Sequence, residues 1–173
     1  MVSHLVGSAI VHAEVDDSWA VTSLECAKGL VRVDRRQGLT RVVVGDTHDS
    51  VAGMHEPPAF SAAAFTSDGE FIVVARRSPP AIAMDPTGSR ITPAGGATLD
   101  SEYPEPGRRF LLLSCAAFED LPEFLATGLE RSPSELISRD AEDLLLCIFA
   151  DHERGAGAVI DRLPPRPLGE LNT

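Results

Sequence analysis

The chain has 173 residues, which suits one domain with a substantial core. Its hydrophobic fraction of 43% and charged fraction of 24% are those of an ordinary soluble globular protein. The net charge is −11 and Lys28 is the only lysine, which argues against nucleic acid and anionic membranes as partners. Cys26, Cys115 and Cys147 are widely spaced and form no CxxC pair, so we expect no disulfide framework and no zinc site, and a cytoplasmic location. We also expect no signal peptide and no membrane span.

Short strands dominate the sequence up to Ser114. They are apolar or β-branched runs between polar turns, and the turns Thr66–Gly69 and Asp85–Gly88 carry hairpin signals. The expected strands are Leu5 to Val15, a segment through Trp19, Val21 and Leu24, Gly29 to Val33, Val42 to Val44, Ala59 to Phe65, Glu70 to Arg76, Ala81 to Met84, Ser89 to Thr92, Phe110 to Ser114 and, later, Ala158 to Leu163. This succession favours an antiparallel β-sandwich.

The strand at Val42 to Val44 ends in a group of polar residues. It runs into Gly45 and then reaches Asp46, His48 and Asp49. A strand end holds a carboxylate rigidly at the rim of a sheet, where a metal ion or a substrate can meet it. The structural alternative is a simple turn in which Asp46 caps its own backbone.

Helical patterns appear only late in the chain. Apolar residues recur at helical spacing from Phe118 to Gly128, and Ser132–Glu135 is a capping box with proline at the first helical position. The apolar face of that second helix continues to Phe149. The sequence therefore predicts an α+β domain over residues 1–163, a sandwich with both helices on one face, followed by a Pro-rich tail over residues 164–173.

The order of these segments resembles the metal-dependent PP2C-type serine/threonine phosphatases, and among them the bacterial SpoIIE/RsbU-like branch of sigma-factor regulation. In that branch an early Gly-Asp with a following aromatic residue precedes a strand that ends in Gly-Asp-Val-Ser-Gly-His-Gly. Val15–Trp19 is similar to the first motif and Val44–Asp49 to the second. Arg76–Ala81 resembles the Gly-His-Pro-Pro element of the family, and Pro106–Ser114 resembles the approach to its Thr-Asp-Gly motif. The resemblance covers most of the chain in order.

The resemblance implies a metal site of which only part is present. Clustered carboxylates in the family bind two Mn²⁺ or Mg²⁺ ions, which generate a hydroxide that attacks the phosphoryl group in line. Asp17 and Asp46 match two of these carboxylates, and we expect them to lie close together at one rim of the sandwich. The other two fall on Ala116 and Gly155, which have no side-chain oxygen.

Other residues near these positions are weaker candidates. His48 and Asp49 are an alternative metal pair, although a polar loop tip explains them as well. Four further acidic residues, which are typical of helix ends, are Glu119, Asp120, Asp151 and Glu153. The basic pairs Arg76-Arg77 and Arg108-Arg109 suit either phosphate binding or solvated strand ends. Cys115 is interpreted as a core cysteine.

The chain is shorter than the family pattern at one place. The family has two long helices between the Gly-Asp motif and the next strand, where this chain has only Ser50 to Pro58. We therefore expect a reduced helical layer and an uncovered sheet face, which is normally a partner or oligomer surface.

The sequence predicts a catalytically impaired, pseudophosphatase-like domain that binds a regulatory protein or a second copy of itself. A residual Mn or Mg site at Asp17 and Asp46 is the expected cofactor site. The alternatives are an active Mn/Mg-dependent protein serine/threonine phosphatase of bacterial signalling and an unrelated α+β binding domain.

Overall fold

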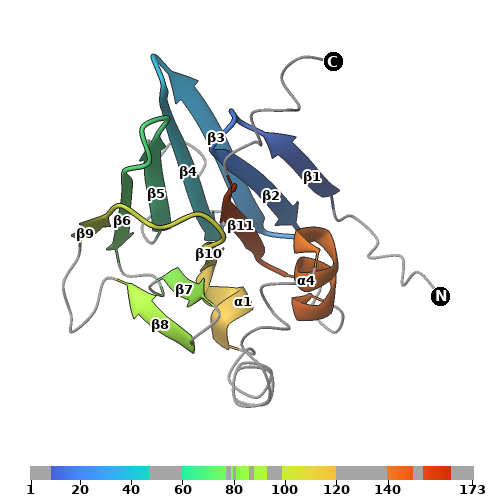
Figure 1. The fold of residues 1–173 in the computed structure, drawn as a ribbon. Coiled ribbons are helices and arrows are strands. Elements are labelled where there is room, and N and C mark those ends of the chain that lie inside the picture. The colour runs from blue at the N-terminus through green and yellow to red at the C-terminus, as the bar shows by residue number, and fades with distance from the viewer. Residues whose placement is uncertain are drawn as a thin grey trace.

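Two antiparallel sheets form the body of the protein (Figure 1). The computed structural model describes residues 9–46, 60–76, 79, 81–85, 88–92, 99–119, 140–149 and 154–164. The six-stranded sheet has, in spatial order, β1 (Ala9–Glu14), β2 (Trp19–Glu25), β11 (Ala156–Arg162), β10 (Arg109–Leu113), β7 (Ala81–Asp85) and β8 (Gly88–Thr92). The five-stranded sheet has β3 (Gly29–Arg36), β4 (Leu39–Asp46), β5 (Phe60–Thr66), β6 (Phe71–Arg76) and β9 (Leu99–Glu102). The predicted sandwich is thereby confirmed.

The main core lies between the two sheets and has aromatic rings at its centre. Trp19 lies 4.7 Å from Phe65 and 5.9 Å from Phe71, centroid to centroid, and Phe71 stacks on Phe110 at 3.8 Å. The indole Nε1 of Trp19 donates a hydrogen bond of 2.8 Å to the carbonyl oxygen of Thr66, so the ring joins β2 of one sheet to β5 of the other. Buried aromatic rings of this kind contribute much of the stability of a domain.

Two helices lie within the described residues. They are α1 (Cys115–Glu119) and α4 (Ala141–Ile148), and Figure 1 shows α4 beside β2 and β11. A second core forms where α4 packs its buried residues Leu144, Leu145 and Ile148 on the outer side of this sheet. Gly157 allows the close approach, because a Cβ there would lie 3.0 Å from Phe149.

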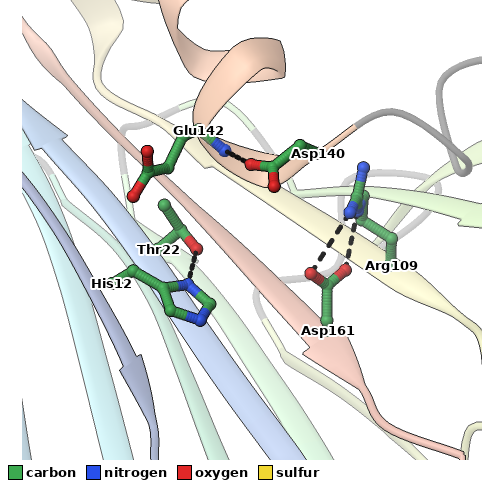
Figure 2. A network of polar contacts seen from close by, with 6 residues as sticks. All are labelled: His12, Thr22, Arg109, Asp140, Glu142 and Asp161. Atoms are coloured by element: carbon green, nitrogen blue, oxygen red, sulfur yellow. Dashed lines mark hydrogen bonds and ion pairs between the residues drawn. The ribbon is translucent and has the colours of Figure 1, made fainter.

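The helix predicted to run unbroken from Ser132 to Phe149 is wrong at Asp140. This residue has a ψ angle of 139°, which is not helical, and its Oδ1 accepts a hydrogen bond of 2.8 Å from the backbone N–H of Glu142 (Figure 2). It is therefore the N-cap of α4, since a capping aspartate satisfies an amide of the first turn. The capping box at Ser132 and most of the predicted Phe118–Gly128 helix lie outside the described residues.

The five-stranded sheet carries no helix on its outer face within the described residues. The reduced helical layer is thus confirmed for the part of the chain that the structure describes. In that same part, no helix has the length and apolar character needed to cross a membrane.

Candidate functional site

Asp46 is placed by the hairpin that joins β3 and β4. Gln37 and Gly38 have positive φ angles of 50° and 78°, which is typical of a two-residue turn between strands of equal length. The two strands then pair in register along their length, and the Cα of Gly29 at the start of β3 lies opposite the Cα of Asp46 at the end of β4. The turn therefore fixes which residues meet Asp46 at the rim.

The carboxylate of Asp46 faces the start of α1. Its Oδ2 accepts a hydrogen bond of 3.0 Å from the backbone N–H of Ala116. Its Oδ1 is buried and accepts no hydrogen bond within the described residues. A buried polar atom without a partner is costly, so this oxygen suits a further ligand.

Gly155 lies next to the same place, held by backbone hydrogen bonds. Its carbonyl oxygen accepts from the N–H of Cys26 at 2.9 Å, and its N–H donates to the carbonyl oxygen of Ala27 at 3.1 Å. The hydroxyl oxygen of Ser114 accepts from the N–H of Ala156 at 3.0 Å and completes this layer. The structure thus brings Asp46, Ala116 and Gly155 together at one rim of the sandwich.

The backbone at this rim leaves no room for added side chains. A Cβ on Gly29 would lie 1.9 Å from the carbonyl oxygen of Gly155. A Cβ on Gly155 would lie 2.7 Å from the hydroxyl oxygen of Ser114, and the φ angle of 100° at Gly155 disfavours any residue with a Cβ. A carboxylate at position 29 would require movement of the backbone, and one at position 155 would require a shift of Ser114 and a strained φ angle.

Asp17 does not lie near Asp46. It belongs to the β1–β2 turn, where the hydroxyl of Ser18 donates to the carbonyl oxygen of Ser67 at 3.3 Å. Ser67 follows Thr66, and Thr66 pairs with Leu39, the first residue of β4. Asp46 is the last residue of this eight-residue strand, which is about 23 Å long at roughly 3.3 Å per residue. The expected proximity of the two aspartates is therefore wrong, because they lie at opposite ends of the sandwich.

The residue opposite Asp46 is Gly29, and it follows the exposed Lys28, whose φ angle is 61°. Sequence reasoning assigned no role to either. The signal was present in the two-residue turn at Gln37 and Gly38, because counting back from that turn pairs Gly29 with Asp46.

The basic pair Arg108-Arg109 is engaged in ion pairs. Arg108 lies 2.6 Å from Glu102, and Arg109 donates to both carboxylate oxygens of Asp161 at 2.6 and 3.2 Å (Figure 2). A bidentate pair of this kind satisfies the guanidinium, so a structural role accounts for Arg109 better than phosphate binding.

The remaining candidates contribute little to the site. Cys115 is only partly buried. Cys26 is buried, and this burial raises the pKa of the Cys26 thiol. Glu119 ends α1 and does not begin it. Several candidates lie outside the described residues, namely His48, Asp49, Arg77, Asp120, Asp151 and Glu153.

Comparisons by sequence gave no match, either to a protein-family model or to a curated protein. Comparisons by structure did. The RsbU and RsbW domains of Rv1364c from Mycobacterium tuberculosis align with a TM-score of 0.61 and 13% identity, over 93% of this chain and 63% of that one. RsbX in complex with magnesium aligns with a TM-score of 0.61 and 11% identity, over 90% of this chain and 100% of that one.

A structure of the PP2C phosphatase domain of SpoIIE from Bacillus subtilis, with a fragment of its regulatory domain, aligns with a TM-score of 0.56 and 8% identity, over 90% of this chain and 71% of that one. The chain has the PP2C-type phosphatase fold. At these identities the likeness concerns the fold alone, so the function of this chain has to be inferred from its own residues.

The two-metal centre that the PP2C resemblance implies does not fit the residues at this rim. Asp46 supplies one carboxylate, Ala116 supplies none, and Gly155 has no space for one. Among the described residues there is no group of three or more His, Cys, Asp or Glu side chains able to hold a metal ion. Mn²⁺ and Mg²⁺ need several oxygen ligands, and the side chains of the described residues alone do not supply such a set.

Proposed function

We propose that this protein is a non-catalytic relative of the PP2C-type phosphatases, a cytoplasmic pseudophosphatase that acts in signalling by binding a regulatory protein. The observation that carries the proposal is the packing around Asp46. Two of the neighbouring positions are glycines whose added Cβ atoms would lie 1.9 and 2.7 Å from other protein atoms. These two positions therefore lack metal-ligating side chains and also lack the space for them.

The chemistry of phosphate-ester hydrolysis explains why this loss matters. In-line attack needs an activated water and a second positive centre that absorbs charge on the phosphoryl oxygens. Among the described residues, Asp46 and Glu25 bring carboxylates to this rim, and Glu25 accepts a hydrogen bond of 2.8 Å from the backbone N–H of Val31. The net charge of −11 repels an anionic substrate. We therefore expect phosphatase activity to be negligible.

A residual Mn²⁺ or Mg²⁺ ion at Asp46 is a separate and weaker part of the proposal. The buried Oδ1 of Asp46, which accepts no hydrogen bond among the described residues, supports it. Asp17 lies at the far end of β4 and takes no part in binding this ion. So few carboxylates give weak affinity, so we expect such an ion not to restore catalysis.

Binding of a regulatory protein is supported by the outer face of the five-stranded sheet. Leu39 and Leu99 are 43% and 59% exposed on strands of this sheet, and no described helix covers the face. Large exposed apolar faces on soluble domains normally mark interaction sites. A structural neighbour that contains both an RsbU and an RsbW domain also supports a protein as the partner. A second copy of this chain is the alternative occupant.

Hydrolysis of p-nitrophenyl phosphate and of a phosphoserine peptide with Mn²⁺ tests the proposal. We expect the wild-type protein and its Asp46→Asn variant to be equally inactive, because neither holds the metal set. Robust turnover by the wild type that disappears in Asp46→Asn would overturn the pseudophosphatase and restore a Mn/Mg-dependent phosphatase. Calorimetric titration with Mn²⁺ measures the residual ion, which the same substitution should abolish.

A further inference from the structure

The outer face of the five-stranded sheet carries an apolar stripe. Side chains alternate along a strand, and Val42 and Val44 of β4 point into the core, so Val43 points outward. Residues directly opposite one another share a face, and the pairs continue from Val43 to Ala62, from Ala62 to Val74 and from Val74 to Leu99. The stripe therefore crosses four neighbouring strands, with Leu99 exposed, Val43 and Val74 partly exposed and Ala62 only 9% exposed.

The same face carries a cluster of arginines along its β3 side. Arg32 lies opposite Val43, and Arg36 lies opposite Leu39, so both are on the outer face, and both are exposed. Arg41 also lies there and forms an exposed ion pair with Asp34, N to O 3.2 Å. The described charged side chains of this face are these three arginines and one aspartate. The face is thus basic on a chain whose net charge is −11.

We propose that this surface, the outer sheet face, binds an acidic amphipathic helix of the regulatory protein. The inference rests on the proposed function and names the chemistry of its partner. The apolar side of the helix packs on the stripe from Val43 to Leu99, and its carboxylates meet Arg32 and Arg36. A helix is the element that normally packs on a sheet face, whereas a strand would need a sheet edge.

The dimensions of the face suit a short helix. Four inter-strand spacings of about 4.8 Å separate β3 from β9, so the face is roughly 19 Å wide. A helix of about 13 residues has this length at 1.5 Å per residue. One amphipathic helix therefore covers both the stripe and the arginines.

Charge argues against a second copy of this chain as the occupant. Two outer sheet faces packed on each other would bring their arginines together, and like charges across an interface are costly. An acidic helix has the complementary charge, and the attraction should weaken as salt is added.

The test uses two designed helical peptides of about 18 residues. They share one leucine-rich face, and their polar positions are glutamate in one peptide and lysine in the other. Fluorescence anisotropy measures the affinity of each for the full chain. We expect the acidic peptide to bind, and the basic peptide to bind at least about tenfold more weakly, since two or three charge contacts change sign.

Matched variants locate the binding site. Leu99→Asp should abolish binding, whereas Ile91→Asp should not, because Ile91 is similarly exposed, at 51%, on the edge strand β8 of the other sheet. The double variant Arg32→Glu, Arg36→Glu should reverse the peptide preference. Arg154→Glu, an exposed charge reversal outside the outer sheet face, should leave the preference unchanged.

Equal binding of both peptides, binding of neither, or equal effects of the face and control variants would overturn the acidic-helix inference. So would light scattering that showed a dimer abolished by Leu99→Asp, because the occupant would then be a second copy. Phosphatase turnover is measured separately and concerns the proposed function, so the failure of one is distinguishable from the failure of the other.

Discussion

Three glycine-to-alanine substitutions separate the two physical causes that close the rim around Asp46. Gly29 has no left-handed φ angle, but its added Cβ would lie 1.9 Å from the carbonyl oxygen of Gly155. Gly107 has a φ angle of 91° with open space around the added Cβ. Gly155 combines a φ angle of 100° with a Cβ 2.7 Å from the hydroxyl oxygen of Ser114. The three variants therefore test lack of space, backbone strain and both together.

The expected losses of stability follow from these contacts. Gly107→Ala should cost about 1 kcal/mol, the usual cost of a left-handed residue with a Cβ. Gly29→Ala meets a backbone carbonyl and not a flexible side chain, so the hydrogen bonds of Gly155 to Cys26 and Ala27 must break or lengthen. We expect a cost of about 3–5 kcal/mol, which places it among the largest single-residue effects. Gly155→Ala should cost at least as much.

Urea unfolding followed by tryptophan fluorescence measures all three. Trp19 is the only tryptophan and is 0% exposed, so its emission reports the loss of the core between the sheets. In thermal melts followed by the same fluorescence, Gly29→Ala should lower the Tm by roughly 10 °C, since 1 kcal/mol corresponds to about 2–4 °C. A Gly29→Ala variant within about 0.5 kcal/mol of the wild type would refute the close approach of the two glycines. That result would also contradict the lack of space for a side chain at this rim.

Three further predictions concern packing and ionisation. Asp161→Asn should cost about 3 kcal/mol in the urea assay, because it weakens the ion pair with Arg109, whose side chain is only 8% exposed. Asp34→Asn weakens the exposed ion pair with Arg41 and should cost less than about 1 kcal/mol in the same assay. Cys147 should react with Ellman's reagent before Cys26, since burial raises the pKa of the Cys26 thiol and keeps it protonated at neutral pH; equal rates would contradict this. Leu144 of α4 is 1% exposed, so Leu144→Ala should cost about 2–5 kcal/mol in thermal melts, and a smaller loss would contradict the packing of α4 on the sheet.

The sequence predicts the strands of the sandwich well because most of them carry their own signal. The hairpin turn after Phe65 and the apolar run at Phe110 correspond to the observed β5–β6 hairpin and to β10. Strand β9 was missed, since Leu99 is the single apolar residue in its four positions and an edge strand needs no more. Local pattern thus predicts strands with a buried face and fails for short edge strands.

The candidate site was predicted only in part because a motif does not state which end of a sheet it occupies. Asp46 was identified from the strand that delivers it, and the structure places it against Ala116, as the order of motifs indicated. Asp17 was chosen because it follows Val15 and precedes Trp19, but the direction of β2 places it at the far rim. The pairing register, which the turn at Gln37 and Gly38 sets, decides which residues meet at each rim.

The contact between Gly29 and Gly155 has a consequence for the history of this fold. A surface residue that mutates can mutate back, and an enzyme that loses one ligand can regain it by a single substitution. Here an aspartate restored at position 155 meets Ser114 and a left-handed backbone, and any side chain at position 29 meets Gly155. A single substitution at either position therefore disturbs a second segment that lies far away in the sequence. Under the proposed pseudophosphatase function, the backbone at these two positions therefore opposes the return of ligating side chains.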